Sequence, residues 1–265
     1  MTDAAALLAD LRSEGEELDA LVAQLPEDQW SAPTPAPGWT IAHQIGHLAW
    51  TDEWTLRSVR DPAGFHSAAT ELLASTTEFS QVVDHGAATG AALPPDELLT
   101  RWRLGRGEVL AGLAEAPPAG SLPWFGPPMK AVSMATARIM ETWAHGDDVA
   151  AALGVERKPT ARLRHIAHLG VRTLGFAFSA HGLAVPTEPV RVELTGPGGE
   201  EWSWGPAQAA DRIAGPALDF CLLVTQRRHP DDLALRATGP VATAWLPIAQ
   251  AFAGPPGAGR APHAN

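Results

Sequence analysis

Cysteine is almost absent from this sequence, which has only Cys221 among its 265 residues. A single cysteine cannot form an intramolecular disulfide, so its use suits the reducing cytoplasm, where we expect the protein to reside. Long apolar runs are also absent, because no stretch approaches the roughly 18 apolar residues that a membrane-spanning helix needs. The sequence therefore predicts a cytoplasmic protein without a membrane partner.

Positive charge is scarce as well. The chain has 19 Lys and Arg residues against 30 Asp and Glu residues, which gives a net charge of −11. The only lysines are Lys130 and Lys158, and no basic stripe follows the chain. Because nucleic-acid phosphates are bound by clustered cations, the composition argues against a nucleic-acid partner and favours small-molecule ligands.

The residues that are present favour an ordered fold. Hydrophobic residues make up 45% of the chain, enough for a substantial core, and the length suits one large domain or two of ordinary size. Apolar residues recur at helical spacing through the first half of the chain. We expect helices over 3–25, 40–60, 62–83, 96–116 and 131–153, with loops over 86–95 and 116–129. Short connections between them favour an antiparallel bundle of four or five helices.

The pattern changes after Gly154. The stretch VRVELTG (190–196) alternates like a strand, and GGEEWSW (198–204) follows a turn signal, which predicts a hairpin. A third strand is expected over 232–239, among helices over 159–182, 209–228 and 241–252. We therefore predict an α+β protein with a helical domain over 1–155 and a small α+β domain over 156–265.

The stretch ETWAHGDDV contains the first candidate site. Glu141 and His145 are four residues apart, so both side chains lie on one face of the expected helix. A carboxylate oxygen and an imidazole nitrogen are ligands that suit zinc and similar divalent ions. The alternative is an ordinary surface Glu–His pair, which stabilises a helix only slightly.

A third ligand could come from another helix. His43 and His47 are also four residues apart, and His47 lies beside the apolar stripe of its helix. Facing helices of a bundle can hold a metal through such side chains. The alternative for each histidine is a place at the edge of the core, with a hydrogen bond to a backbone carbonyl.

These motifs carry a family resemblance. PGWTIAHQIGHLAW and ETWAHGDDVAAALG resemble the DinB-like metal-binding superfamily, in its mycothiol-dependent maleylpyruvate isomerase branch. The resemblance implies a four-helix bundle that holds a divalent metal, usually zinc, through His47, Glu141 and His145. The stretches LPWFGPPMKAVSMATARIMETWAHGDDV, DFCLLVTQRRHPDDL and WLPIAQAFAGPPGAGR are similar to a subgroup of actinobacterial metal-binding proteins that carry a wyosine-formation domain label.

The resemblance also implies a co-substrate, the low-molecular-weight thiol mycothiol. A metal-bound thiolate could add to a small electrophile and leave again, which is isomerisation, or stay attached, which is S-transfer. Hydrolysis by a metal-activated water is a third outcome, and metal-dependent binding of a small molecule without turnover is a fourth. A role in base modification of transfer RNA would fit the domain label, but the acidic composition speaks against it. A homodimer is compatible with all of these functions.

Further residues are candidates for supporting roles. His43 could orient a ligand or serve as a fourth ligand, and Asp148 could orient His145, as carboxylates near metal sites do. Arg228 could bind the acidic groups of the thiol, although cations at a helix end are equally explained by the helix dipole.

Four aromatic residues flank the candidate site in the sequence. Trp124 and Phe125, in the proline-rich loop, could form an apolar rim for the substrate or simply cover the end of the bundle. We expect Trp39 and Trp143 to belong to the core.

Overall fold

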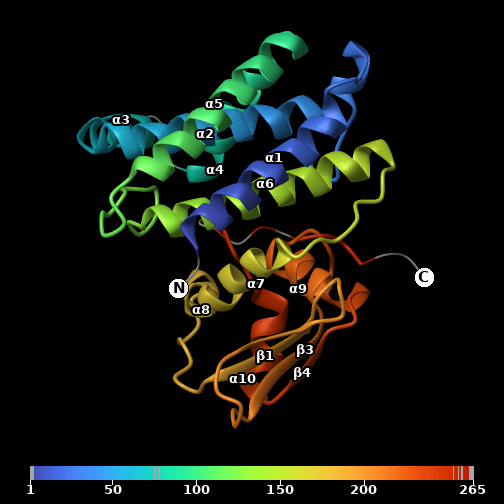
Figure 1. Cartoon of the computed structure of the whole chain (residues 1–265). Coiled ribbons are helices and arrows are strands. Elements are labelled where there is room, and N and C mark those ends of the chain that lie inside the picture. Colours follow the sequence, from blue (N-terminus) through green and yellow to red (C-terminus); the bar gives the residue numbers. More distant parts are fainter. Residues whose placement is uncertain are drawn as a thin grey trace. The chain divides into compact units, whose positions relative to one another are not determined.

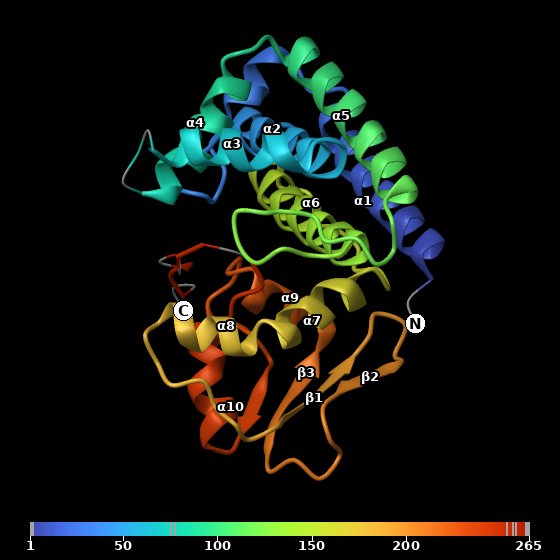
Figure 2. The ribbon, with the colours of Figure 1, turned by 90° about the vertical axis from the view of Figure 1, so that its left-hand side faces the viewer.

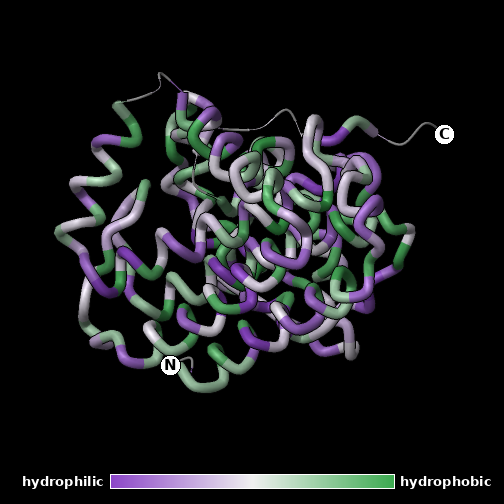
Figure 3. Tube along the Cα trace, turned by 90° about the horizontal axis from the view of Figure 1, so that it is seen from above, coloured by the Kyte–Doolittle hydropathy of each residue, from purple (hydrophilic) through white to green (hydrophobic). Residues whose placement is uncertain are grey.

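The structure, a computed structural model, describes residues 3–74, 76, 78–252, 254–255, 257 and 259–262. The chain divides into two compact units, residues 1–157 and 158–265. Figure 3 shows hydrophobic and hydrophilic residues alternating in short runs along the chain. Among the described residues, no helix combines the length and the apolar character that crossing a bilayer requires.

The first unit is helical (Figure 1). Four long helices, α1, α2, α5 and α6, form a bundle in which α1 packs on α5 and α6, and α2 packs on the same two helices. Two shorter helices, α3 and α4, pack against α2. The bounds are α1 Ala4–Val22, α2 Ile41–Arg60, α3 Pro62–Ala74, α4 Phe79–Ala91, α5 Pro95–Glu115 and α6 Ala131–Leu153, with a 3-10 turn over Glu27–Ser31.

The bundle core follows from helical periodicity. Ile41, Ile45 and Leu48 recur at spacings of three and four along α2, and all three are fully buried. They pack in one cluster with Leu18 of α1 and Trp102 of α5. The sequence predicts a buried stripe of Ile41, Ile45, Leu48 and Trp54 on α2, and the first three are confirmed, whereas Trp54 is only half-buried.

The helix predicted over 62–83 is wrong, because α3 ends at Ala74 and α4 begins at Phe79. Within that range, Ser75 and Thr77 lie outside the described residues. The loop predicted over 86–95 is also wrong in its first part, since α4 continues to Ala91.

The glycines of α4 are contact residues rather than helix breakers. A Cβ atom at Gly90 would lie 2.5 Å from the Cα atom of Gly46 on α2, and one at Gly86 would lie 2.7 Å from the Trp50 ring. Glycine lets the backbones of α2 and α4 approach this closely. The close packing explains why a glycine-rich stretch is helical here (Figure 2).

The second unit contains a four-stranded sheet in the order β2-β1-β3-β4. β1 and β3 are parallel, with Val192 beside Ile213, and the two outer strands are antiparallel to their neighbours. The bounds are α7 Leu163–Arg172, α8 Leu174–Ala180, β1 Val190–Thr195, β2 Glu201–Trp204, β3 Asp211–Pro216, α9 Ala217–Val224, β4 Arg236–Thr238 and α10 Pro240–Trp245, with 3-10 turns over Pro230–Asp232 and Leu246–Ile248. The α+β class and the β1–β2 hairpin are confirmed.

Three helices predicted in this unit are wrong in extent. The range 209–228 holds strand β3 before helix α9, and Gly215, with a φ of 153°, precedes the Pro216 junction between them. The range 159–182 holds two helices, α7 and α8, that meet at Thr173. The final helix ends at Trp245, and Pro247 lies in the 3-10 turn that follows. Proline and glycine end regular structure at two of these three points.

Candidate metal centre

The contact between α2 and α6 brings three candidate ligands together. His47 comes from α2, while Glu141 and His145 come from successive turns of α6. The Oε2 atom of Glu141 lies 3.2 Å from Nε2 of His47 and 3.3 Å from Nε2 of His145. The ligand atoms of the three residues all lie within 4.8 Å of one another. The sequence-predicted trio thus converges on one point.

The surroundings of Glu141 favour its charged form. Both histidines are buried, while the Glu141 side chain is 23% exposed. Burial would raise the pKa of Glu141, but hydrogen bonds and charge interactions with His145 and His47 outweigh it and hold the pKa well below its usual value. The site therefore holds a carboxylate between two imidazoles.

A chain of hydrogen bonds orients His145. The Thr34 hydroxyl donates to the backbone carbonyl of Trp39, and the amide nitrogen of Gln44 donates to Thr34. This leaves Oε1 of Gln44 as the acceptor for Nδ1 of His145, at 2.5 Å. With Nδ1 bonded to Gln44, Nε2 faces Glu141, where it either donates a proton to that carboxylate, as in the hydrogen bond that lowers the pKa of Glu141, or presents its lone pair to a cation.

This arrangement fits a cation. A lone pair and a carboxylate oxygen repel one another unless a proton or a cation lies between them. Two imidazole nitrogens and one carboxylate oxygen form a ligand set that is common for zinc. Ligand atoms held at about 2.1 Å from a tetrahedral ion lie roughly 3.4 Å apart. The separations at Glu141, 3.2 and 3.3 Å, match that spacing.

Trp39 lies over the site, so the expectation that it belongs to the core is wrong. Its ring is half-buried, stacks on His145 with the centroids 5.9 Å apart, and lies 5.4 Å from the His47 ring. Its Nε1 atom donates to Asp84 on α4 at 2.9 Å. Trp39 therefore covers the two imidazoles and limits the access of water to them.

An aromatic cluster continues from the site. Trp50, one turn after His47, lies 6.2 Å from the His47 ring and stacks on Phe125 at 6.0 Å. Phe125 also contacts Trp54, Phe65, Phe79 and Trp124. Trp124 and Phe125 are half-buried, so they offer apolar surface beside the candidate centre.

The other predicted residues lie in different settings. His43 caps α2, since its Nδ1 atom accepts hydrogen bonds from the Thr40 amide and hydroxyl, and it lies outside the group of three. Asp148 is buried on α6, one turn after His145, and Trp143 is buried as expected. Arg228 is half-buried in the second unit, after α9. The roles predicted for His43, Asp148 and Arg228 stay predictions.

Two residues near the ligands escaped the sequence reasoning. Gln44 precedes His47 by three residues and so lies on the same face of α2, which was a usable signal. Trp39 gave no such signal, because it precedes the helix and only the loop conformation places it over the histidines.

Comparisons with known proteins agree with this fold. The family model of the mycothiol maleylpyruvate isomerase N-terminal domain matches residues 11–150, and the model for wyosine base formation matches residues 186–238. An uncharacterized protein found in two strains of Mycobacterium tuberculosis is 58% identical over 260 residues, covering 98% of this chain and 100% of the relative.

Solved structures share the fold. The crystal structure of the mycothiol-dependent maleylpyruvate isomerase matches with a TM-score of 0.60 and 17% identity, over 89% of this chain and 92% of that one. A histidine-to-alanine mutant of that isomerase matches over the same shares, with a TM-score of 0.61 and 16% identity.

Proposed function

The chain belongs to the family of the mycothiol maleylpyruvate isomerase N-terminal domain, and from this premise we propose that it is a metal-dependent enzyme that uses a low-molecular-weight thiol. The observation that carries the proposal is the convergence of His47, Glu141 and His145 on one point. We propose zinc as the metal, held by these three residues, and mycothiol as the thiol.

Among the residues that the structure describes, three candidate ligands form this group, which is the number typical of catalytic rather than structural zinc sites. When bound, a divalent cation favours the thiolate form of a coordinating thiol, which is the reactive nucleophile. Gln44 holds His145 in the tautomer that presents Nε2, and Trp39 covers both imidazoles. These residues orient the ligands and exclude water.

The chain's own thiol is unsuited to the nucleophilic role. Cys221 is fully buried in the second unit, and burial raises the pKa of its thiol far above the usual range. Its Sγ atom donates to the carbonyl of Leu163 at 3.3 Å. A thiol nucleophile therefore has to come from a co-substrate.

The substrate that this chemistry suits is a small electrophile with an activated double bond. The thiolate sulfur would form a bond to one alkene carbon, the former double bond would rotate, and the carbon–sulfur bond would break again. The product is the geometric isomer, and the thiol is released unchanged. The aromatic surface around Trp50 and Phe125 would accept the apolar part of such a molecule.

The fate of the thiol tests the proposal. Zinc-loaded protein would be mixed with mycothiol and maleylpyruvate, while the alkene geometry and the free thiol are both followed. Isomerisation without thiol consumption supports the proposal, and loss of one thiol per product would identify an S-transferase that uses the same centre. Turnover that needs the metal but not the thiol would identify a hydrolase, and binding without turnover would identify a binding protein; either result contradicts the thiol-dependent enzyme.

Two variants make that assay specific. Glu141→Gln keeps the size of the side chain but removes its charge, so activity should fall at least about a hundredfold. His85→Ala removes an exposed histidine of α4 outside the group of three, and its activity should match that of the unaltered protein. The cytoplasmic location and the homodimer stay predictions.

A further inference from the structure

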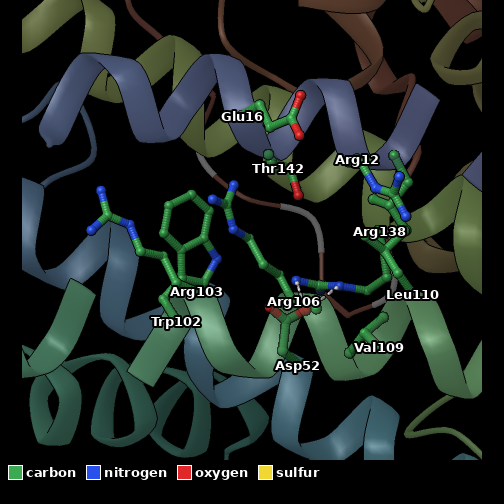
Figure 4. A pocket seen from close by; sticks show the side chains of 13 residues that line it. Arg12, Glu16, Asp52, Trp102, Arg103, Arg106, Val109, Leu110, Arg138 and Thr142 are labelled. Carbon is green, nitrogen blue, oxygen red and sulfur yellow. Dashed lines mark hydrogen bonds and ion pairs between the residues drawn. The ribbon is translucent and has the colours of Figure 1, made fainter. Parts of the chain in front are cut away.

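A second site lies on another side of the bundle. A cavity of about 230 Å³ opens among α1, α2, α5 and α6 of the first unit (Figure 4). None of the three candidate metal ligands lines it, although Thr142, which follows Glu141 on α6, does. The cavity is therefore separate from the metal centre, and the inference drawn from it does not rest on the proposed function.

Arginine is concentrated in this cavity. Arg12, Arg103, Arg106 and Arg138 line it, which is four of the 19 basic residues of an acidic chain. The acidic groups among them are Glu16 and Asp52, which line the cavity, and Asp19, which pairs with two of the arginines. Four positive charges against three negative ones leave one positive charge in excess.

The ion pairs leave that excess on Arg12 and Arg106 together, because Glu16 is the remaining acid and it also interacts with Arg106. Asp52 and Arg138 pair with each other at 3.1 Å, both almost completely buried. Arg103 donates to both carboxylate oxygens of Asp19, and Nη2 of Arg106 donates to one of the same two oxygens. Arg106 therefore shares its acidic partner with Arg103. A guanidinium has five N–H donors, and one shared carboxylate cannot satisfy them all.

The local packing holds the Arg106 guanidinium in the cavity. Its CZ atom lies 4.6 Å from the centre of the Trp102 ring, and Figure 4 shows the two side chains side by side. Gly15 on α1 leaves room for it, because a Cβ atom there would lie 2.9 Å from Nη1 of Arg106. Burial and the neighbouring Arg103 lower the pKa of Arg106, although nearby acids oppose them. A half-buried cation with donors to spare is a binding group for an anion.

Apart from Thr142, the uncharged side chains of the lining are apolar. Trp102, Val109 and Leu110 of α5 face Leu11 of α1 across the cavity. A volume of 230 Å³ is just below the usual range of small-molecule sites, about 300–1,000 Å³. The site therefore combines an excess of positive charge with a partly apolar wall and room for a small ring.

We propose that this cavity binds a small organic carboxylate with a flat apolar body. The carboxylate would accept hydrogen bonds from Arg106 and Arg12, and the apolar body would lie against Trp102 and Leu110. The ligand would then contact α1, the helix α5 and, through Thr142, the helix that bears Glu141 and His145.

Benzoate is the probe for this site, and benzamide, which has the same ring but no charge, is its matched control. Calorimetric titration of the full chain should show one benzoate per chain, with benzamide at least about tenfold weaker, because only the carboxylate accepts hydrogen bonds in which both partners are charged. Arg106→Gln should weaken benzoate binding by a similar factor. Arg101→Gln, which removes an exposed arginine of the same helix that pairs with Glu53, should leave it unchanged.

An NMR measurement tests the proposal in the unaltered protein, without the two arginine variants. Benzoate should shift the indole N–H signal of Trp102, identified by its loss in Trp102→Phe. Equal binding of benzoate and benzamide, no benzoate binding at all, an equal loss in the Arg101 and Arg106 variants, or an unshifted Trp102 signal would each overturn the proposal.

Discussion

The Nδ1 atom of His145 lies 2.5 Å from Oε1 of Gln44, and this bond decides which nitrogen of the histidine faces Glu141. Gln44 is itself fixed, because its amide nitrogen donates to Thr34. The metal site that we propose therefore depends on a residue that contacts no metal.

Removal of the Gln44 acceptor should weaken metal binding. Gln44→Leu keeps the volume but leaves Nδ1 of His145 without its acceptor, so the Kd for zinc should rise about 10- to 100-fold. Gln44→Glu keeps an acceptor and is the matched control, with a much smaller effect. Competition with a chromophoric chelator measures both, and an unchanged Kd in Gln44→Leu would show that the tautomer is not set by Gln44.

Alanine should have opposite effects at Gly90, which lies in the contact between α2 and α4, and at Gly107, which lies outside it on α5. Gly90→Ala would press a Cβ atom against Gly46, and overpacking of this kind costs about 1–3 kcal/mol. Gly107→Ala adds a methyl group with nothing within 4 Å inside helix α5, so it should stabilise by up to about 1 kcal/mol. Urea unfolding measures both, and equal stability of the two variants would contradict the close approach.

Asp52 predicts a pH dependence of stability. Burial raises the pKa of Asp52 from its ordinary 3.8 to about 6, although Arg138 and Arg106 lower it and Glu53 raises it slightly. The folded state then binds the proton more tightly than the unfolded state does. This contribution is fully present below pH 3.8 and is lost as the pH rises through about 6.

The comparison with Asp52→Asn isolates that contribution. As the pH rises from about 4 to 7, the unaltered protein should lose on the order of 3 kcal/mol relative to the variant. Unfolding free energies of both proteins across this range measure the difference. A relative gain for the unaltered protein would mean that Arg138 outweighs burial and holds the pKa low.

Cys221 should be unreactive in the folded protein. Its side chain is fully buried, and burial raises the pKa of the thiol, so little thiolate is available to a reagent. A chromogenic disulfide reagent should detect no thiol under native conditions and one per chain after unfolding in guanidinium. Rapid labelling of the native protein would show that this part of the second unit opens readily.

Much of the fold could be predicted because helical periodicity is dense in the first half of the chain. Ile41, Ile45 and Leu48 belong to one stripe, and the two family motifs identified the bundle. The errors came where tertiary contacts override local signals. Gly86 and Gly90 indicate a loop in the sequence, and only their contact with α2 explains why they are helical. The residues of β3 and α9 form one apolar run in the sequence, and only the pairing of Ile213 with Val192 identifies the first part as a strand.

The candidate site was predictable only in part, for a similar reason. Glu141 and His145 are linked by a helical spacing that the sequence displays, and the family motif added His47. The covering ring of Trp39 depends on the path of a loop, and the four arginines of the cavity come from three helices, α1, α5 and α6. No periodicity within one segment can reveal such a cluster.

The metal content of the purified protein tests the central claim most directly. Elemental analysis should find about one zinc ion per chain in the unaltered protein and in His43→Ala, whose histidine lies outside the group of three. His47→Ala and Glu141→Ala should each lose it. An unaltered protein that holds no divalent metal even after reconstitution would contradict the claim, and so would metal retained in both ligand variants.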